Sequence, residues 1–363
     1  MQKFEFTREE IVQDLTKMGI EKGDVLLVHS SLRSIGYVPG GAETMIDALL
    51  KSVREEGTVV VPTITGQIFD SPKYPPSFSK DKPCWTGIVS ETFRKRKNAY
   101  RSRHPTHSVA AIGKNARRIT EGHENAETPC GNGTPYLKVS EFNGKILFIG
   151  TTLKANTTFH SAEELAKLYY HIQPEPSICK IGMDGEQIER KCFLHAYGTP
   201  RAFEEKEREL LEHKIARIGY IGRARSILVD ARKMIEFTLG RIEEDRLYLV
   251  EKHHMDLWSI SSGIRLLQEE KLKSMRISLY LPKSATVKFS DNRMVVNGVK
   301  MNLFGLSFIN GVLETRLKIV KDLELDGGYN YWLKLKKIER GIEIEILDFK
   351  ESGSLFCLTP FSQ

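Results

Sequence analysis

Short apolar runs alternate with longer stretches of helical spacing along the first two thirds of the chain. The runs are rich in valine, isoleucine and leucine and predict buried strands; they occupy residues 23–30, 57–63, 107–113 and 144–150. Apolar positions at helical spacing predict helices at 40–57 and 87–97, and charged helical stretches predict more; these lie at 200–216, 226–242 and about 256–273. Strands that alternate with helices indicate a layered α/β domain.

The pattern changes after residue 273 to short alternating runs with tight turns. The segments "RMVVNGVKM" and "LSFINGVLETRL" are each centred on an Asn-Gly pair, Asn297-Gly298 and Asn310-Gly311. Because Asn and Gly tolerate the positive φ that a two-residue hairpin requires, each pair predicts a hairpin turn. We therefore predict two domains, an α/β domain over residues 1–273 and a small antiparallel β module over residues 274–363.

The composition is that of a folded protein with room for two domains, since 40% of the 363 residues are hydrophobic and 28% are charged. No apolar run approaches the about 18 to 20 residues needed to span a bilayer, and charges stand at the start where a signal peptide needs an apolar stretch. We expect a cytoplasmic protein without membrane contacts. The formal net charge of +7 favours an anionic partner, either nucleic acid or a small phosphorylated ligand.

The five cysteines form no metal-binding or disulfide pattern. They lie far apart, are odd in number and include no CxxC pair, which argues against a zinc site and a disulfide framework. We expect reduced and mostly buried thiols, and the residues are Cys84, Cys130, Cys179, Cys192 and Cys357.

Three segments are suited to binding a ligand, and each also has a purely structural interpretation. In "VHSSLRSIGYVPGG" (28–41), hydroxyl side chains and two glycines lead into a predicted helix whose first amides either suit a phosphate or serve only a strand-to-helix turn. In "RKRKNAYRSRHPTHS" (94–108), six Arg or Lys residues either hold a phosphate, with His104 and Ser108 at the sheet edge, or form a solvated face. In "CGNGTPYLKV" (130–139), a rigid loop either presents amides to a ligand or is a connector, and a structural role is favoured for its cysteine.

The fourth segment, "NTTFHSAEEL" (156–165), follows a predicted strand and begins a helix near Thr158. His160 and Glu163 stand at i and i+3 and so share one face, whereas Glu164 points about 100° away and is expected in solvent. A carboxylate beside an imidazole fixes its tautomer and supports its positive charge, as a general base requires. Thr157 or Thr158 can donate a hydrogen bond to a developing oxyanion. From spacing alone, a catalytic pair and an ordinary surface helix stay equally open.

A helical metal site is another chemistry that this spacing suggests. Such sites repeat a Glu-x-x-His type of pair and need further ligands of matching type, which the segment 156–165 does not supply. We therefore expect no metal.

Taken in order, these segments resemble those of the aminoglycoside 3-N-acetyltransferase family, also called the antibiotic N-acetyltransferase family. The resemblance covers about residues 8–245, and the matching pieces are "VHSSLRSIGYVPGG", "GTVVVPTITG", "TGIVSETFRKRKNAYRSRHPTHSVAAIG", "CGNGTPYLKV" and "ILFIGTTLKANTTFHSAEELA". It implies a layered α/β/α fold with a central mixed sheet, distinct from the GNAT fold, and an acyl-CoA-dependent N-acyltransferase domain over residues 1–273. The implied reaction moves an acetyl or short acyl group from acetyl-CoA or another acyl-CoA to a primary amine of an amino sugar or aminoglycoside-like acceptor.

The resemblance also implies roles for residues of this chain. His160 is implied as the general base, Glu163 as its partner and Thr157 as the oxyanion donor. The implied contacts to coenzyme A lie in the first three segments, and they are Ser30, Ser31, Leu32, Val38, Pro39, Gly40, Gly41, Ser108, Gly133 and Thr134. Asp70, Glu127 and Tyr136 are candidate contacts of the acceptor, and surface placement explains each of them equally well.

The residue chemistry agrees with an acyl transfer. An amine bound as ammonium must lose a proton before it attacks a thioester, and a positioned base with an oxyanion donor suffices for that reaction. We therefore expect direct transfer without a covalent acyl-enzyme. The alternative is a non-catalytic binding protein on the same fold, in which the basic run 94–103 contacts nucleic acid or an anionic polymer. Our expected partners are a small-molecule amine, no nucleic acid and no membrane, and formation of a homo-oligomer stays open.

Overall fold

The computed structural model describes residues 5–250, apart from 68–69, 73, 169–170, 174–175, 184, 196–200 and 247, together with strands between residues 274 and 348. The chain forms two compact units. The first comprises residues 1–168, 176–195 and 202–249, and the second comprises residues 169–175, 196–201 and 250–363. Residues 251–273 lie outside the described residues, so the predicted domain boundary at 273 stays a prediction.

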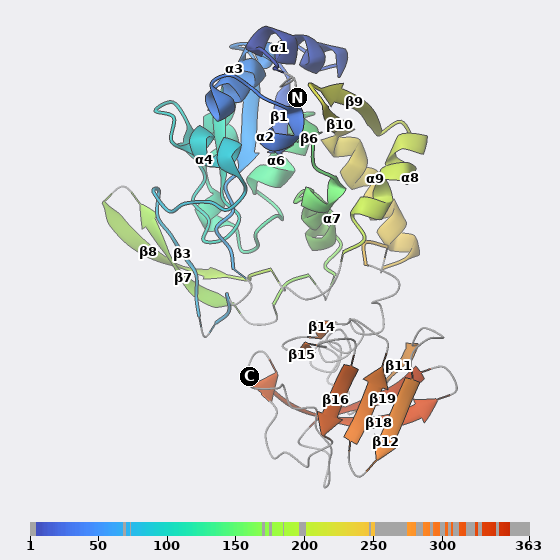
Figure 1. Ribbon diagram of the computed structural model, residues 1–363. Coiled ribbons are helices and arrows are strands. Elements are labelled where there is room, and N and C mark those ends of the chain that lie inside the picture. Colours follow the sequence, from blue (N-terminus) through green and yellow to red (C-terminus); the bar gives the residue numbers. More distant parts are fainter. Residues whose placement is uncertain are drawn as a thin grey trace. The chain divides into compact units, whose positions relative to one another are not determined.

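A seven-stranded mixed sheet forms the centre of the first unit (Figure 1). Its strands are β1 (Val25–Ser30), β2 (Thr58–Pro62), β4 (Tyr100–Arg101), β5 (Val109–Gly113), β6 (Lys145–Ile149), β9 (Ala216–Ile221) and β10 (Ala224–Asp230). They stand in the order β4-β5-β2-β1-β6-β10-β9. β1 runs parallel to both of its neighbours, β2 and β6, and the remaining pairs are antiparallel. The carboxyl ends of β1, β2 and β6 therefore meet at one edge of the sheet.

Helices cover this sheet. The α-helices of the described residues are α1 (Arg8–Lys17), α2 (Leu32–Ile35), α3 (Gly41–Val53), α4 (Ile88–Arg94), α5 (Ala116–Thr120), α6 (Pro135–Glu141), α7 (Phe159–Leu165), α8 (Glu207–Glu212) and α9 (Ala231–Glu244). Short 3-10 turns accompany them, namely η1 (His123–Asn125), η2 (Leu153–Ala155) and η3 (Glu204–Lys206). Of the helices described here, none is long and apolar enough to cross a membrane.

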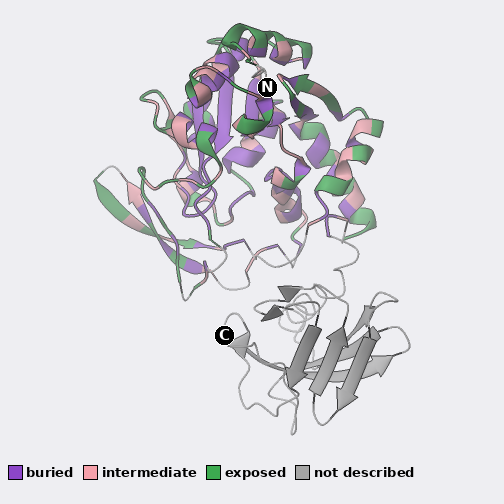
Figure 2. Ribbon diagram, viewed as in Figure 1, coloured by how far each residue is buried: buried purple, intermediate pink, exposed green. Residues whose placement is uncertain are grey.

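The central strands β1, β2 and β6 are buried on both faces (Figure 2). Leu26, Val28 and Leu147 join one apolar cluster with residues of α1, α3 and α4. Leu27 and Phe148 alternate with them and are fully buried on the opposite face, because successive side chains of a strand point to opposite sides. On that side α6 and α7 both pack against α9. The predicted layered fold with a central mixed sheet is therefore confirmed.

The predicted strands and the first two predicted helices are present as β1, β2, β5, β6, α3 and α4. The helix predicted at 226–242 is wrong in its first part, because residues 224–230 form β10, antiparallel to β6. Ser226, Ile227 and Val229 are fully buried there, so tertiary pairing decided the structure of a short apolar run. The predicted helix at 200–216 includes α8, and the one at about 256–273 lies outside the described residues.

A smaller sheet contains β3 (Ser77–Phe78), β7 (Ser177–Met183) and β8 (Glu186–Cys192). β7 and β8 form an antiparallel hairpin, and β3 pairs with β7 in parallel. Cys179, Cys192 and Leu194 form a small buried cluster at this sheet. Cys130 is buried as well, whereas Cys84 is half-buried, which agrees with the expectation of mostly buried thiols; Cys357 lies outside the described residues.

The described strands of the second unit pair antiparallel, as the sequence predicts. One sheet holds β11 (Ser274–Tyr280), β17 (Glu324–Leu325), β18 (Tyr329–Ile338) and β19 (Gly341–Asp348), a second holds β12 (Thr286–Ser290), β13 (Arg293–Asn297) and β16 (Val312–Arg316), and a third holds β14 (Asn302–Leu303) and β15 (Leu306–Ser307). The predicted hairpin turn at Asn297-Gly298 is wrong, because β13 pairs with β12 and β16, and Asn297 stands opposite Val312. Asn310-Gly311 lies outside the described residues.

Candidate functional site

The carboxyl edge of the central sheet brings the predicted segments together. Ser30 is the last residue of β1 and lies opposite Ile149, the last residue of β6. Ser108 stands just before β5 and lies beside Thr63, just after β2, where the Thr63 amide donates to the Ser108 carbonyl at 2.8 Å. In open α/β sheets ligands bind outside the carboxyl ends of parallel strands. Segments far apart in sequence thus share the edge at which a site is expected.

An irregular connection leads from β6 to α7. Gly150 and η2 are followed by Asn156, a fully buried residue. Its side-chain oxygen accepts from the Thr158 amide at 3.2 Å, and its side-chain nitrogen donates to the Met234 sulfur of α9 at 3.1 Å. These two bonds place Thr157, which is 7% exposed, immediately before the first turn of α7.

His160 and Glu163 form a close pair on α7, as their spacing predicts. His160 Nδ1 and Glu163 Oε2 are 2.6 Å apart. The Glu163 side chain has no exposed surface, while that of His160 is 14% exposed. Because the carboxylate holds Nδ1, the opposite nitrogen, Nε2, is the one turned away from Glu163 and suited to exchange a proton with a bound acceptor.

Two aromatic rings of residues that sequence reasoning missed pack around His160. The His195 ring lies 4.5 Å from the His160 ring between centroids, and the Phe203 ring lies 5.1 Å away. His195 is 8% exposed and Phe203 is 3% exposed. His195 follows β8 and Phe203 precedes η3, so neither has a sequence spacing that links it to His160. Contact across the tertiary fold is the signal that identifies them.

The "HPTH" turn adds further histidines behind His195. The His107 ring lies 5.9 Å from that of His195. His104 is fully buried, and its Nδ1 accepts from the Thr106 and His107 amides at 3.2 and 3.0 Å. His104 also stacks on His123 at 4.5 Å. Burial holds the pKa of His104 well below its usual value, so its neutral ring closes the turn.

The hydroxyl of Ser108 is engaged inside the protein. Ser108 is fully buried, and its Oγ donates to the Thr63 carbonyl at 2.7 Å and lies 2.9 Å from the Thr63 hydroxyl. These bonds join the end of β2 to the start of β5. The structure therefore gives Ser108 a clear structural role, and its contact with coenzyme A stays a prediction.

Ser30, Ser31 and Leu32 lie where β1 passes into α2, and all three are half-buried. The Ser31 amide donates to the Ile149 carbonyl at 2.8 Å, which ties this turn to the end of β6. The Ser31 and Ser34 hydroxyls are 2.9 Å apart. The turn is thus anchored directly beside the strand that leads to His160.

The turn before α3 has the backbone of a glycine turn. Gly40 and Gly41 have φ of 77° and 60°, and no side chain caps the first turn of α3. Val38 is 6% exposed, and the Thr44 hydroxyl donates to the Pro39 carbonyl at 2.5 Å. A helix start without a side-chain cap leaves amide donors that suit an anion. The predicted phosphate contact fits this geometry and stays a prediction.

The loop before α6 corrects one expectation. Gly133 is exposed at φ 76°, while Thr134 is fully buried. Burial raises the pKa of the Cys130 thiol well above its usual value, which keeps it protonated and fits the structural role favoured for it. Glu164 is not simply solvated as expected, because it is half-buried and its Oε1 accepts from the Cys130 amide at 2.9 Å.

The three predicted acceptor contacts differ in exposure. Glu127 is exposed. Asp70 is 5% exposed and accepts from the Gln67 amide at 2.7 Å, and burial raises its pKa. Tyr136 has no exposed surface, so its side chain packs inside the unit. All three acceptor contacts stay predictions.

The basic run at 94–103 is largely engaged within the protein. Arg94 forms an ion pair with Glu91 at 2.5 Å, and Arg96 forms one with Asp47 of α3 at 2.7 Å. Arg101 is half-buried and donates to backbone carbonyls. These three arginines are therefore not a solvated face, whereas Lys95 and Lys97 are exposed as that interpretation expects. Arg96 and Arg101 tie the end of α4 and β4 to neighbouring segments.

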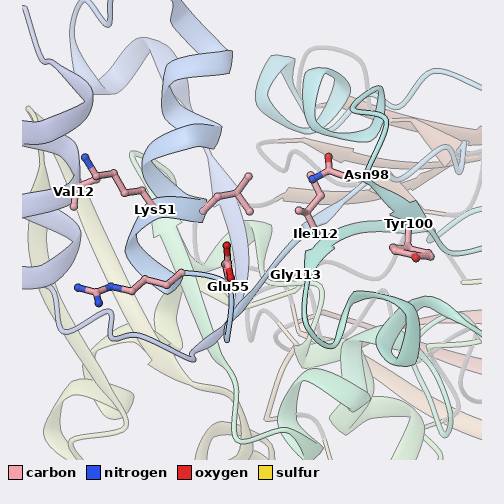
Figure 3. A pocket seen from close by; sticks show the side chains of 9 residues that line it. Val12, Lys51, Glu55, Asn98, Tyr100, Ile112 and Gly113 are labelled. Atoms are coloured by element: carbon pink, nitrogen blue, oxygen red, sulfur yellow. The ribbon is translucent and has the colours of Figure 1, made fainter.

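A surface hollow of about 910 Å³ lies away from the predicted site (Figure 3). Lys51 and Glu55 stand on one side of it, and Asn98, Tyr100 and Ile112 on the other. None of the predicted catalytic or binding residues lines it. It borders the end of β5, at the opposite edge of the sheet from Ser30 and Ser108, because Gly113 pairs with the first residue of β2.

The chain resembles known proteins over most of its first unit. A family model described as aminoglycoside 3-N-acetyltransferase matches residues 27–243. Aminoglycoside N(3)-acetyltransferase IV of Salmonella sp is 32% identical over 245 residues, which cover 68% of this chain and 90% of that protein. A mutant of aminoglycoside acetyltransferase AAC(3)-IVa, solved as a crystal structure in complex with a gentamicin, has 29% sequence identity to this chain. The match covers 70% of this chain and 95% of that protein's chain, with a TM-score of 0.61. AAC-IIIb, solved as a binary complex with CoASH, is 26% identical over 66% of this chain and 97% of its own, with a TM-score of 0.58.

Proposed function

The chain belongs to the aminoglycoside 3-N-acetyltransferase family, and we propose that His160 acts as the general base in transferring an acetyl group from acetyl-CoA to a primary amine of a sugar-like acceptor. The observation that carries the proposal is the His160–Glu163 pair, because a buried carboxylate 2.6 Å from Nδ1 is the arrangement that a base needs. The pair belongs to α7, the first α-helix after β6, whose end lies at the carboxyl edge of the sheet.

The proposed reaction balances as a direct transfer. The acceptor amine arrives as an ammonium ion and gives a proton to His160 Nε2, and the free amine then attacks the thioester carbonyl. A C–N bond forms, the C–S bond breaks, and the leaving thiolate takes up a proton to become the free thiol. One proton is released to water in each turnover. Glu163 stabilises the imidazolium in the step that forms it, so its effect is largest in the transition state.

Thr157 is proposed to stabilise the oxygen that becomes negative during the attack. Its amide donates to the Ala155 carbonyl, and its own carbonyl accepts from the His160 amide at 3.0 Å. These two bonds hold its backbone beside the base. A hydroxyl carried on a backbone held in this way needs little reorganisation to donate to an oxyanion, which is the property that gives such donors their effect.

The donor is proposed to lie along the turns at the carboxyl edge. Ser30 to Leu32 are anchored to β6, and the turn Val38 to Gly41 leads into α3. The amides at that helix start suit the pyrophosphate of coenzyme A, and the exposed Gly133 loop is proposed as a further contact of the donor. The binary complex of AAC-IIIb with CoASH supports this class of donor.

The acceptor is proposed to be an amino sugar or an aminoglycoside-like amine. The relative AAC(3)-IVa was solved with a gentamicin and with apramycin, which supports this class. Glu127 and Asp70 are the carboxylates proposed to meet an ammonium group. Substrate ranking across a panel of aminoglycosides and nucleotide-linked amino sugars, measured as thiol release from acetyl-CoA, identifies the acceptor.

The role of His160 is tested with His160→Ala. We expect kcat to fall by roughly 10²-fold or more, because general-base catalysis contributes about that much, with the affinity for acetyl-CoA nearly unchanged. His213→Ala is the matched control, since His213 is exposed after α8, and it keeps wild-type turnover. Near-normal turnover of His160→Ala sinks the assignment. Salt-dependent binding of DNA by a wild type that binds no acetyl-CoA supports the non-catalytic alternative instead.

A further inference from the structure

Two successive carboxylates of α7 serve different parts of the site. Glu163 holds the imidazole of His160. Glu164 turns the other way, and its Oε1 accepts from the backbone amide of Cys130 at 2.9 Å. Cys130 opens the loop that leads into α6 and is itself fully buried. Helix α7 therefore carries both His160 and Glu163, and through Glu164 it is also bonded to the start of this loop.

A side chain at Gly131 would press on the carboxylate of Glu164. A Cβ on Gly131 would lie 2.6 Å from Glu164 Oε2 and 2.7 Å from the Thr128 hydroxyl. The Gly131 carbonyl in turn accepts from the Thr134 hydroxyl at 2.7 Å and from its amide at 3.2 Å, which closes the loop on itself. The start of the loop is thus held by Glu164 and by the hydrogen bonds between Gly131 and Thr134.

The tip of the same loop is open to solvent. Asn132 and Gly133 are exposed, and a Cβ built on Gly133 would meet nothing within 4 Å. A loop whose start is anchored and whose tip is exposed can present backbone groups to a ligand. The bond between Glu164 and Cys130 joins this loop to the helix that carries His160.

We propose that Glu164 is a positioning residue that holds the Cys130–Thr134 loop against the helix of the base, and so sets the affinity for acetyl-CoA. The proposal rests on the proposed function, in which Gly133 and Thr134 contact the donor. Glu164 itself touches neither substrate in this account. Its contribution passes through the loop, whereas the contribution of Glu163 passes through the imidazole.

The split between KM and kcat tests this proposal. In Glu164→Ala the Cys130 amide loses a charged acceptor, and we expect KM for acetyl-CoA to rise roughly 5- to 30-fold, with kcat at saturating donor within about twofold of wild type. Glu164→Gln keeps an acceptor oxygen, so its KM stays within about threefold. Glu141→Ala, at the exposed end of α6, is the matched control and leaves KM unchanged.

Gly131→Ala is a second substitution that disturbs the contact between the loop and Glu164, and it leaves Glu164 itself in place. Its Cβ pushes on the carboxylate, so we expect KM for acetyl-CoA to rise here too. The two substitutions act on one contact, and the double variant is therefore less than additive in KM. This second variant keeps the test decisive if Glu164→Ala does not fold.

The outcomes separate the two proposals. Wild-type KM in both Glu164→Ala and Gly131→Ala, with an active wild type, overturns the role of Glu164 alone. A parallel fall in kcat at saturating donor in Glu164→Ala also overturns it, because the defect then lies in the chemistry. A wild type that binds no coenzyme A and releases no thiol with any amine overturns the proposed function, and this proposal with it.

Discussion

Glu163→Gln is the sharpest test of how the site works, because it removes a charge and almost no volume. In the wild type the carboxylate is fully buried and lies 2.6 Å from His160 Nδ1. The amide of glutamine keeps the packing but offers no negative charge to an imidazolium. The perturbation therefore acts on the protonated state of the base, which forms during the reaction.

The size of the effect follows from the geometry. A hydrogen bond to a charged group contributes about 1.5 to 3 kcal/mol, and burial of Glu163 leaves solvent little chance to screen it. Each 1.36 kcal/mol is a factor of ten in rate, so kcat should fall roughly 10- to 150-fold. KM for acetyl-CoA should change by less than about threefold, because the interaction is made after the donor has bound.

The assay is thiol release from acetyl-CoA at saturating donor and acceptor, with Glu141→Gln as the control for loss of an exposed carboxylate. Equal unfolding midpoints of Glu163→Gln and the wild type show that the fold is intact. The double variant His160→Ala with Glu163→Gln should be no slower than His160→Ala, since Glu163 works through the imidazole. Wild-type kcat in Glu163→Gln, or fully additive losses in the double variant, refute the reasoning.

Three further outcomes are expected. His195→Phe keeps an aromatic ring beside His160 and should retain kcat within about threefold, measured by thiol release. His195→Ala leaves a gap beside His160 and should lower kcat about tenfold in the same assay. Equal kcat in the two variants contradicts a packing role for His195. Burial lowers the pKa of His29 to about 3 from about 6.5. The contribution of the neutral His29 ring to the free energy of unfolding is therefore fully present above pH 6.5 and is lost as the pH falls toward 3. At pH 5 the loss from this residue is about 2 kcal/mol. The difference in unfolding free energy between pH 7 and pH 5 should shrink by that amount in His29→Leu, and an unchanged difference means that the ring is not held neutral. Gly40→Ala puts a Cβ against the Thr44 hydroxyl at φ 77°, and it should raise KM for acetyl-CoA several-fold and lower the unfolding midpoint. Gly23→Ala, at φ 89° with open space around it, is the control and should lower only the midpoint. Wild-type KM in Gly40→Ala contradicts a donor contact at this turn.

Local pattern was sufficient for the elements that carry the site. The apolar runs predict β1, β2, β5 and β6, and helical spacing predicts α3 and α4, because burial of a strand or a helix face imposes its own period on the sequence. The pair of His160 and Glu163 was predictable for the same reason. Residues at i and i+3 of a helix are neighbours whatever surrounds the helix.

Long-range contacts were beyond the reach of this reasoning. The run at 226–229 is too short to tell a strand from a helix by periodicity, and only its pairing with β6 made it β10. His195 carries no spacing that relates it to His160, and only the fold brings the two rings to 4.5 Å. Helical geometry placed Glu164 away from His160 but said nothing of the Cys130 amide that it meets.

The layered α/β fold, the helix after β6 and the contact between His160 and Glu163 could therefore be predicted from the chain's own pattern, whereas the role of His160 as a base was implied only by the resemblance to the family. Each of the three predicted features depends on residues within a few positions of one another. Folding in three dimensions established which groups surround the base, which hydroxyls face inward, as Ser108 does, and how the basic run is neutralised. Those features depend on contacts between distant segments, for which a single sequence contains no period to read.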